Sequence, residues 1–309
     1  MTDHLSSVRW LTDSPELLQT LDHIEILYTD LDGTLLGKGG TLLVDGAGNA
    51  STATADAVVR ANQADLTIVP VTGRSRIQTT EIVRMCGWSD FIAEAGAIRS
   101  YWNGVSRENI WEVSGWSPAV FARMEAAGAT PLDMIRQAGA LDALREAFPG
   151  RVEHHEPWHM ARECTDVLRG YLDREAAQVV LDQLDLGITL VDNGVINPRS
   201  HTLDACDEPI RAYHLVPTGT SKAAAIRADL HHRGIDPANA AMIGDSPSDM
   251  LTASEVGVAV LVENALTSPG LAESLAEHPN AAVVTGRSGD GWVGFVNALL
   301  ERREGRSQH

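Results

Sequence analysis

Two carboxylates placed directly after a β-prone run constrain this chain more than any other feature. Residues 24–29 are mostly apolar, and Asp30 and Asp32 follow them, with Gly33 next. Side chains two positions apart on a strand project to the same side, so both carboxylates would point to one place beyond the strand's carboxyl end. A folded protein tolerates such repulsion when a cation lies between the groups or when they share a proton. The pattern predicts a site built for a metal ion and a phosphate.

Three more polar segments lie at the ends of strand-like runs or at the start of a helix-like run. In chain order they are Thr72-Gly73-Arg74 after residues 66–71, Lys222 after the turn at residues 217–221, and Asp245 with Asp249 after residues 240–243. Together with residues 30–34 they resemble, in the same order, the four motifs of the haloacid dehalogenase (HAD) superfamily of phosphatases. The resemblance covers residues 20–95 and 215–285.

The fold class follows from an alternation of strand and helix patterns in both matched parts. Such alternation is typical of a parallel sheet with crossover helices, and ligands then bind beyond the carboxyl ends of the strands. We expect an α/β fold with a Rossmann-like HAD core, a parallel sheet flanked by helices, formed by residues 1–95 and 213–309. Residues 96–212 are expected to form an inserted α+β cap, similar in outline to the cap of the Cof-type and sucrose-phosphatase-like branch.

The expected elements of the cap come from local patterns. They are a hairpin turning at Asn103-Gly104, helices near residues 117–127, 132–147 and 173–185, and strands near 151–155, 166–171, 187–191 and 194–197. The run at residues 210–216 is expected to lead the chain back into the core.

The resemblance implies a catalytic role for four side chains. Asp30 would be the nucleophile that forms an aspartyl-phosphate and so divides hydrolysis into two displacements. Asp32 would act as the general acid and then as the general base. Thr72 would donate hydrogen bonds to the phosphate, and Lys222 would offset the charge of the phosphoryl group and of Asp30.

The cofactor expected on this reading is Mg²⁺, which prefers carboxylate oxygens and phosphate as ligands. Asp30 and Asp245 would each supply one side-chain oxygen, and the resemblance implies the backbone carbonyl of Asp32 as a third ligand. Asp249 lies four residues after Asp245, a spacing that places both on one helix face. Asp249 is therefore expected to bind the metal directly or through a neighbour.

Three further residues are expected to bind substrate. Gly73 would let the phosphate approach the backbone closely, and Arg74 would reach the phosphate or the leaving group. Asn264 is similar in position to an asparagine beside the phosphate in Cof-type relatives. A nucleotide P-loop around Lys222 is excluded, because Ser221 stands where that motif requires glycine.

Several other polar and aromatic residues leave alternatives open. The pairs His154-His155 and His231-His232 are unsuited to chelating one metal, because adjacent side chains point apart. Four tryptophans fall in the expected cap and could stack on a sugar or nucleobase or simply pack the cap: Trp102, Trp111, Trp116 and Trp158. At the junction of core and cap the relatives commonly carry Asn-Gly-Ala, whereas this chain has Ala95-Gly96-Ala97. The narrow subfamily, and with it the substrate, is left open.

The composition of the chain indicates which classes of binding partner to expect. With 309 residues and a formal net charge of −18, the chain is poorly suited to sequence-independent nucleic-acid binding. It has no apolar run long enough to span a bilayer, and its three dispersed cysteines suit a reducing compartment. We expect a cytoplasmic enzyme with no nucleic-acid or membrane partner, and the sequence leaves its oligomeric state open.

The function expected from these observations is that of a phosphoric monoester hydrolase. It would depend on Mg²⁺ and act on a small phosphorylated metabolite, such as a sugar or polyol phosphate, through an aspartyl-phosphate. Two alternatives stay open. A phosphotransferase or phosphomutase would use the same nucleophile, and a non-catalytic binding protein could keep the HAD fold.

Overall fold

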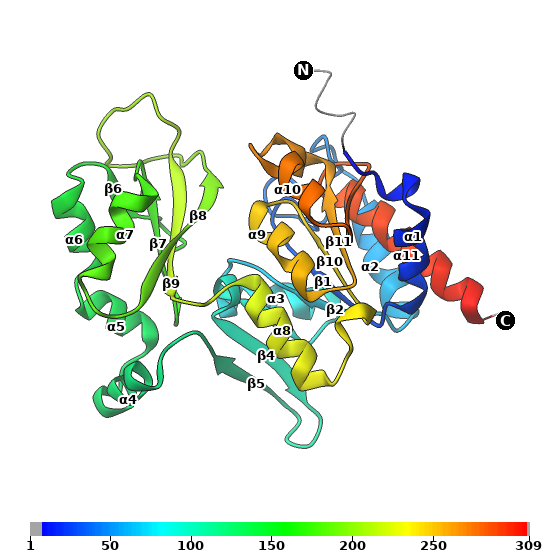
Figure 1. The fold of residues 1–309 in the computed structure, drawn as a ribbon, viewed down its shortest axis with the longest axis horizontal. Coiled ribbons are helices and arrows are strands. Elements are labelled where there is room, and N and C mark those ends of the chain that lie inside the picture. The colour runs from blue at the N-terminus through cyan, green and yellow to red at the C-terminus, as the bar shows by residue number, and fades with distance from the viewer. Residues whose placement is uncertain (1–7, 308–309) are drawn as a thin grey trace.

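The larger of two lobes is built on a parallel sheet with the strand order β12-β11-β10-β1-β2. The structure, a computed structural model, describes residues 8–307, and Figure 1 shows both lobes. The strands of this sheet are β1 Ile26–Thr29, β2 Thr67–Pro70, β10 Ala240–Gly244, β11 Val258–Val262 and β12 Ala281–Val284. Every residue of β1 is buried, as expected for a strand covered on both faces.

Helices cover both faces of the sheet. Their bounds are α1 Pro15–Thr20, α2 Ala53–Gln63, α3 Arg76–Cys86, α8 Lys222–Arg233, α9 Pro247–Met250, α10 Leu271–Glu277 and α11 Gly289–Ser307. Short 3-10 turns lie at η2 Leu11–Asp13, η3 Leu21–His23, η4 Glu94–Gly96, η5 Pro237–Asn239, η6 Leu251–Glu255 and η7 Glu263–Thr267. Apolar residues of α2 and α11 pack on one face, and those of α8, α9 and α10 pack on the other. This three-layer arrangement is the expected α/β core.

The register of the sheet determines where the motifs meet. Thr29, the last residue of β1, pairs with Pro70 of β2 and with Ile243 of β10. The residues that follow these strands therefore leave the sheet at one edge. Strand ends from three distant parts of the sequence converge there, at the edge where open α/β sheets bind their ligands.

A small antiparallel sheet continues the core beyond β2. Its strands are β3 Phe91–Ala93, β4 Ile98–Asn103 and β5 Glu108–Val113. A parallel bridge between Val71 and Ile92 joins it to the end of β2. The predicted hairpin is thus present as β4 and β5, but β4 pairs with β3 and Arg99 donates to the carbonyl of Ala228 in α8.

The smaller lobe is a four-stranded antiparallel sheet with helices against it (Figure 1, green). The strand order is β6-β7-β9-β8, with bounds β6 Val152–His154, β7 Asp166–Gly170, β8 Ile188–Val195 and β9 Arg211–Pro217. Its helices are α4 Pro118–Ala127, α5 Pro131–Gln137, α6 Ala140–Ala147 and α7 Arg174–Asp182. One apolar cluster fills the space between sheet and helices. We call this lobe the cap.

Three local expectations for the cap were wrong in detail. The single helix predicted near residues 132–147 is two helices, separated at Gly139, whose φ is 71°. The strands predicted near 187–191 and 194–197 form one strand, β8, with an irregular register between Asp192 and Val195. The run at 210–216 lies in the cap sheet as β9 and does not re-enter the core. As an inner strand it is buried from Ala212 to Pro217 and is mostly apolar, so its pattern resembles that of a core strand. The overall limits of core and cap remain a prediction.

Candidate active site

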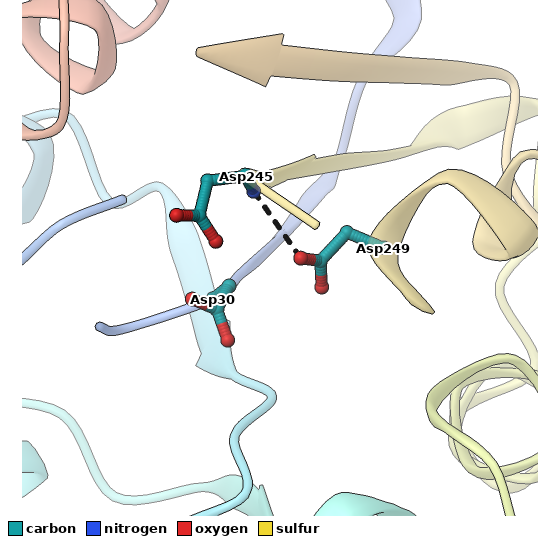
Figure 2. Close-up of side chains that lie close together, drawn as sticks. All are labelled: Asp30, Asp245 and Asp249. Atoms are coloured by element: carbon teal, nitrogen blue, oxygen red, sulfur yellow. Dashed lines mark hydrogen bonds between the residues drawn. The ribbon is translucent and has the colours of Figure 1, made fainter. Parts of the chain in front are cut away.

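Three carboxylates meet at the edge of the core sheet. Asp30 and Asp245 directly follow β1 and β10, and Asp249 lies in α9 (Figure 2). Each offers one oxygen, and these oxygens lie within 4.8 Å of one another. The Asp30 N–H donates to the carbonyl of Ile243 at 2.9 Å, which continues the sheet pairing into the site. The strand ends therefore place the cluster that the sequence predicts.

Lys222, the first residue of α8, neutralises part of this cluster. Its buried ammonium group donates to Asp30 Oδ1 and to Asp249 Oδ1, both at 2.7 Å. The two carboxylates raise the pKa of Lys222 against the opposing effect of burial, which is the largest single influence. Lys222 is therefore a fixed positive charge beside the predicted nucleophile.

Asp249 is already saturated with hydrogen bonds. Its Oδ1 accepts from Lys222, and its Oδ2 accepts from the N–H of Asp245 at 3.2 Å and from the N–H and hydroxyl of Ser246 at 3.0 and 2.6 Å. Asp30 and Asp245 each keep one carboxylate oxygen without a hydrogen bond to any residue from 8 to 307. These contacts favour Asp249 as a support for Lys222 and the Asp245 loop.

Burial and crowding shift the titration of the two strand-end carboxylates. Burial raises the pKa of Asp30 to about 7, although Lys222 opposes that shift and Asp249 adds to it. Burial also raises the pKa of Asp245 to about 8, and the negative charges of Asp30 and Asp249 add to this shift. A divalent cation between these groups would relieve the repulsion that adds to both shifts.

The loop after β1 is shaped around Asp245. Gly33 has a φ of 87°, and a Cβ at this position would collide with Asp245 Oδ2. Asn264 donates from Nδ2 to Asp245 Oδ2 at 3.0 Å and to the Gly33 carbonyl at 3.1 Å. Its Oδ1 accepts from the N–H of Ser288 at 2.7 Å. Asn264 thus holds the Asp245 carboxylate against the first loop, and its role as a substrate ligand remains a prediction.

These residues fit a Mg²⁺ ion. The donor set is made of hard oxygen atoms, which Mg²⁺ prefers. Gly33 leaves room for the Asp245 carboxylate, and burial, with a smaller contribution from neighbouring carboxylates, raises the pKa of Asp30 and of Asp245. Asp30 and Asp245 would hold the ion, and a ligand role for the Asp32 carbonyl remains a prediction.

The second motif, Thr72-Gly73-Arg74, follows β2 and lies on the core side of the site. Thr72 is 2% exposed, and its hydroxyl accepts from the N–H of Arg74 at 3.2 Å. The N–H of Thr72 donates to the carbonyl of Ile92, so the Thr72 hydroxyl is the group that remains free to donate. The N–H of Gly73 has no acceptor among residues 8–307. Both groups can therefore donate to a phosphate in the cavity.

Asp32 does not join the carboxylate cluster through its side chain. Arg74 donates from Nε to Asp32 Oδ2 at 2.7 Å and from Nη2 to Asp32 Oδ1 at 2.5 Å. This bidentate pair lies near the surface, since the Asp32 side chain is 54% exposed. The pair raises the pKa of Arg74, and it holds the predicted general acid at the rim of the cavity.

Core and cap together enclose a cavity of about 530 Å³. Seven of the sequence-predicted residues line it, namely Asp30, Asp32, Thr72, Gly73, Arg74, Lys222 and Asp245. Its cap side is lined by residues to which the sequence assigned no role in this site: His155, Arg162, Asn193 and His214, with Val167 and Ala212 between them. Trp158, one of the four tryptophans, also lines the cavity.

A cap loop is fastened to the core beside this cavity. Glu94, fully buried after β3, accepts hydrogen bonds from the N–H groups of Glu163, Cys164 and Thr165 at 3.0, 3.1 and 2.8 Å, and from the Thr165 hydroxyl. Arg162 Nη2 donates to the Gly73 carbonyl at 2.9 Å. We call residues 162–165 the anchored loop. It ties the cap to the second motif.

The other tryptophans and the second histidine pair lie away from the cavity. Trp102 and Trp111 are on the β4–β5 hairpin and are about half exposed, whereas Trp116 is buried in the cap. His231 and His232 lie in the last turn of α8. Across residues 8–307 no helix combines the length and the apolar character required to cross a bilayer.

One sequence family matches part of the chain. The family described as HAD-hydrolase-like matches residues 214–286, a stretch that includes Lys222, Asp245 and Asn264. No curated protein matches the chain by sequence. The matched part is the second half of the core.

Solved structures match nearly the whole chain. A protein from Thermoplasma acidophilum has a TM-score of 0.58 at 15% identity, covering 90% of this chain and 99% of that one. The sucrose-phosphatase from Synechocystis sp., solved with sucrose and phosphate, has a TM-score of 0.57 at 13% identity, covering 91% and 98%. A HAD-superfamily phosphatase from Bacteroides thetaiotaomicron has a TM-score of 0.53 at 19% identity, covering 91% and 96%. The expected fold class, a HAD core with a cap, is confirmed.

Proposed function

We propose that this chain, a HAD-superfamily protein by its fold and by the family match within its core, is a Mg²⁺-dependent phosphatase of a small phosphorylated metabolite. The observation that carries the proposal is the placement of Asp30. Its carboxylate lines the cavity, receives a hydrogen bond from Lys222 and lies in one cluster with Asp245. A phosphate placed between these groups would face a nucleophile and a fixed positive charge.

The first half of the reaction belongs to Asp30. Its free oxygen attacks phosphorus, the bond from phosphorus to the leaving oxygen breaks, and an aspartyl-phosphate forms. Lys222, the Thr72 hydroxyl and the Gly73 N–H stabilise the charge on the phosphoryl oxygens. Mg²⁺ held by Asp30 and Asp245 would offset the negative charge that phosphate and carboxylates bring together.

Proton transfer belongs to Asp32. It gives a proton to the leaving alkoxide and later removes one from the water that attacks the aspartyl-phosphate. Both carboxylate oxygens of Asp32 are engaged by Arg74, so Asp32 can act on the leaving oxygen only after this pair opens. Arg74 also lines the cavity, and we expect an incoming phosphate dianion to draw it away from Asp32. Binding of substrate would thus release the acid.

The test is removal of the nucleophile. Asp30→Asn keeps the shape of the side chain but removes its negative charge, and we expect phosphate release to fall by roughly 10³- to 10⁶-fold. The measurement is inorganic phosphate released from p-nitrophenyl phosphate and a panel of sugar phosphates, with Mg²⁺ and with EDTA. Asp142→Asn is the matched control, because the Asp142 side chain is 85% exposed on α6.

Three outcomes would contradict the proposal. Turnover by Asp30→Asn at the rate of the unchanged protein would remove Asp30 as nucleophile. Transfer of the phosphoryl group to an added alcohol in preference to water would replace the hydrolase with a phosphotransferase. Equal activity with and without EDTA would remove the metal from the mechanism.

A further inference from the structure

We propose that the face of the cap sheet turned toward the cavity is a subsite for the leaving group, and that it accepts an uncharged, hydroxyl-bearing group and rejects a second anion. His155, Asn193 and His214 would bind that group, and Trp158 would cover it. This inference rests on the proposed phosphatase function and adds to it the chemical class of the leaving group.

The strand register brings these residues to one face. Val167 of β7 pairs directly with His214 of β9, and the N–H of His155 donates to the Val167 carbonyl at 2.9 Å. Residues directly opposite one another on neighbouring strands share a face of the sheet. His155, directly after β6, therefore forms a row with Val167 of β7 and His214 of β9, and all three line the cavity. Asn193 of β8 lines it from the neighbouring strand.

The row lies directly over the phosphate-binding part of the core. A Cβ built on Gly73 would lie 3.1 Å from His214 Cε1, so the His214 ring packs against the second motif. A phosphate bound between Asp30, Thr72 and Lys222 would therefore direct its leaving group toward the cap sheet. The cavity volume of about 530 Å³ is within the range of sites for small molecules.

The charge on the cap side excludes a second anion. Among the described cap residues that line the cavity, Arg162 is the only one with a permanently charged side chain. Its guanidinium donates to the Gly73 carbonyl and to Thr165, and its Nε lies 3.8 Å from the buried Glu94 carboxylate. That charge is already balanced. A carboxylate or second phosphate on the leaving group would be buried without a cation, which is costly.

The same wall offers hydrogen bonds suited to hydroxyl groups. Burial lowers the pKa of His155 to about 4 and lowers the pKa of His214 well below its usual value, so both imidazoles are neutral near pH 7. A neutral imidazole has one donor and one acceptor, and the Asn193 carboxamide likewise offers N–H donors at one end and an acceptor oxygen at the other. The Nδ1 atoms of both histidines are buried and have no partner within residues 8–307. Hydroxyl groups can supply both kinds of partner.

Trp158 provides an apolar surface at the same place. Its side chain lines the cavity yet leaves the residue 51% exposed. An indole face left open beside polar groups suits the C–H face of a sugar or polyol, which is apolar on one side and hydroxylated at its edges. The combination of neutral polar groups and one aromatic face is what distinguishes this wall from the charged core wall.

The test compares matched substrates that differ in one charge. Sorbitol 6-phosphate and 6-phosphogluconate have the same chain length and differ at carbon 1, a hydroxymethyl group against a carboxylate. Glycerol 3-phosphate and 3-phosphoglycerate form a shorter pair. With saturating Mg²⁺ we expect kcat/KM for the uncharged member of the better-used pair to be higher by at least about tenfold.

The outcomes separate this inference from the phosphatase function. Hydrolysis of p-nitrophenyl phosphate with preference for the carboxylated member, or with no use of either pair, overturns the subsite and leaves the phosphatase. Absence of hydrolysis of every substrate, p-nitrophenyl phosphate included, overturns both. Preference for the uncharged member supports the subsite.

Variants of His155 test its assignment. His155→Leu removes the hydrogen bonds, and we expect kcat/KM for the preferred substrate to fall by about tenfold, mostly through KM. His155→Gln keeps a donor and an acceptor, so it should recover at least a third of the kcat/KM that His155→Leu loses. His231→Leu, at the exposed end of α8, is the matched control. Equal kinetics for His155→Leu and the unchanged protein, at equal Tm, overturn the assignment of His155.

Discussion

The cavity has a core wall, lined by residues of the core lobe, and a cap wall, lined by residues of the cap. The two walls differ in charge and in how many hydrogen bonds their side chains already make. On the core wall, Asp30, Lys222 and Asp249 form a chain of buried ionic hydrogen bonds at 2.7 Å. On the cap wall, His155 and His214 carry buried nitrogen atoms with no partner in the described chain. A group whose hydrogen bonds are already made is preorganised for one reaction, whereas a group without partners is available to a ligand. In the proposed phosphatase, the core wall would therefore carry out the chemistry and the cap wall would select the substrate.

The largest effect is expected from removing the positive charge of the core wall. Lys222→Met leaves two buried carboxylates without their shared cation, and we expect a loss of about 3–5 kcal/mol in the free energy of unfolding. We also expect kcat to fall roughly 10²- to 10³-fold for every substrate alike. Urea unfolding in EDTA and initial rates with Mg²⁺ measure the two effects.

The chain offers a matched control for this variant. Its only other lysine, Lys38, is exposed, so Lys38→Met should change the free energy of unfolding by less than about 0.5 kcal/mol. A Lys222→Met protein that is as stable as Lys38→Met would show that the buried ionic chain does not hold the core wall together. Loss of activity on one substrate only would give the core wall a role in selection.

The carboxylates of the core wall should make the stability of the protein depend on pH and on Mg²⁺. Asp30 and Asp245 have pKa values raised to about 7 and 8, above the usual value near 3.8. The folded state therefore binds more protons than the unfolded state between about pH 4 and 8. Their contribution to stability is complete at low pH and is lost as the pH rises through this window. Mg²⁺ competes with these protons, so it should raise Tm more at pH 8 than at pH 5.

Thermal unfolding with Mg²⁺ and with EDTA at the two pH values measures this effect. In EDTA, Asp245→Asn should reduce the fall in Tm between pH 5 and pH 8, because one of the two groups no longer titrates. A Mg²⁺-induced rise in Tm that is the same at both pH values would contradict a metal held by Asp30 and Asp245.

The smallest predicted effect concerns the cap wall. Asn193→Lys adds a positive charge to a wall whose described lining has one balanced cation, and it should favour an anionic leaving group. We expect the ratio of kcat/KM for 6-phosphogluconate over sorbitol 6-phosphate to rise about fivefold, as one partly exposed ion pair is worth roughly 1 kcal/mol. A change that affects both substrates equally would show that Asn193 does not contact the leaving group.

The core wall could be predicted from sequence because each of its motifs is local. A β-prone run followed by Asp30 and Asp32 indicates a strand end, and parallel strands bring such ends to one edge. The residues 66–71 and 240–243 gave the same signal before Thr72 and Asp245. What no local pattern could provide is the hydrogen bonding among them, such as the two contacts of Asn264 with Asp245 and Gly33.

The cap wall could not be predicted in the same way. His155 lies directly after β6, Asn193 lies in β8 and His214 in β9, and only the register of the folded sheet places them on one face. The strand that carries His214 is apolar enough to pass for a core strand. One signal was present in the sequence: adjacent residues on a strand point apart, so one member of the His154-His155 pair had to face away from the other. Trp158 was similarly visible as an aromatic residue in the cap.

The hydrogen bonds between Glu94 and the anchored loop limit how the cavity can open. Lifting the whole cap would strip a fully buried carboxylate of its donors, at a cost of several kcal/mol. We therefore expect the cap to open by rotation about this corner, with the rim opposite the corner moving farthest. Molecules then enter and leave through a wedge-shaped gap. If the proposed function holds, the width of that gap would limit the size of the phosphate ester that can enter.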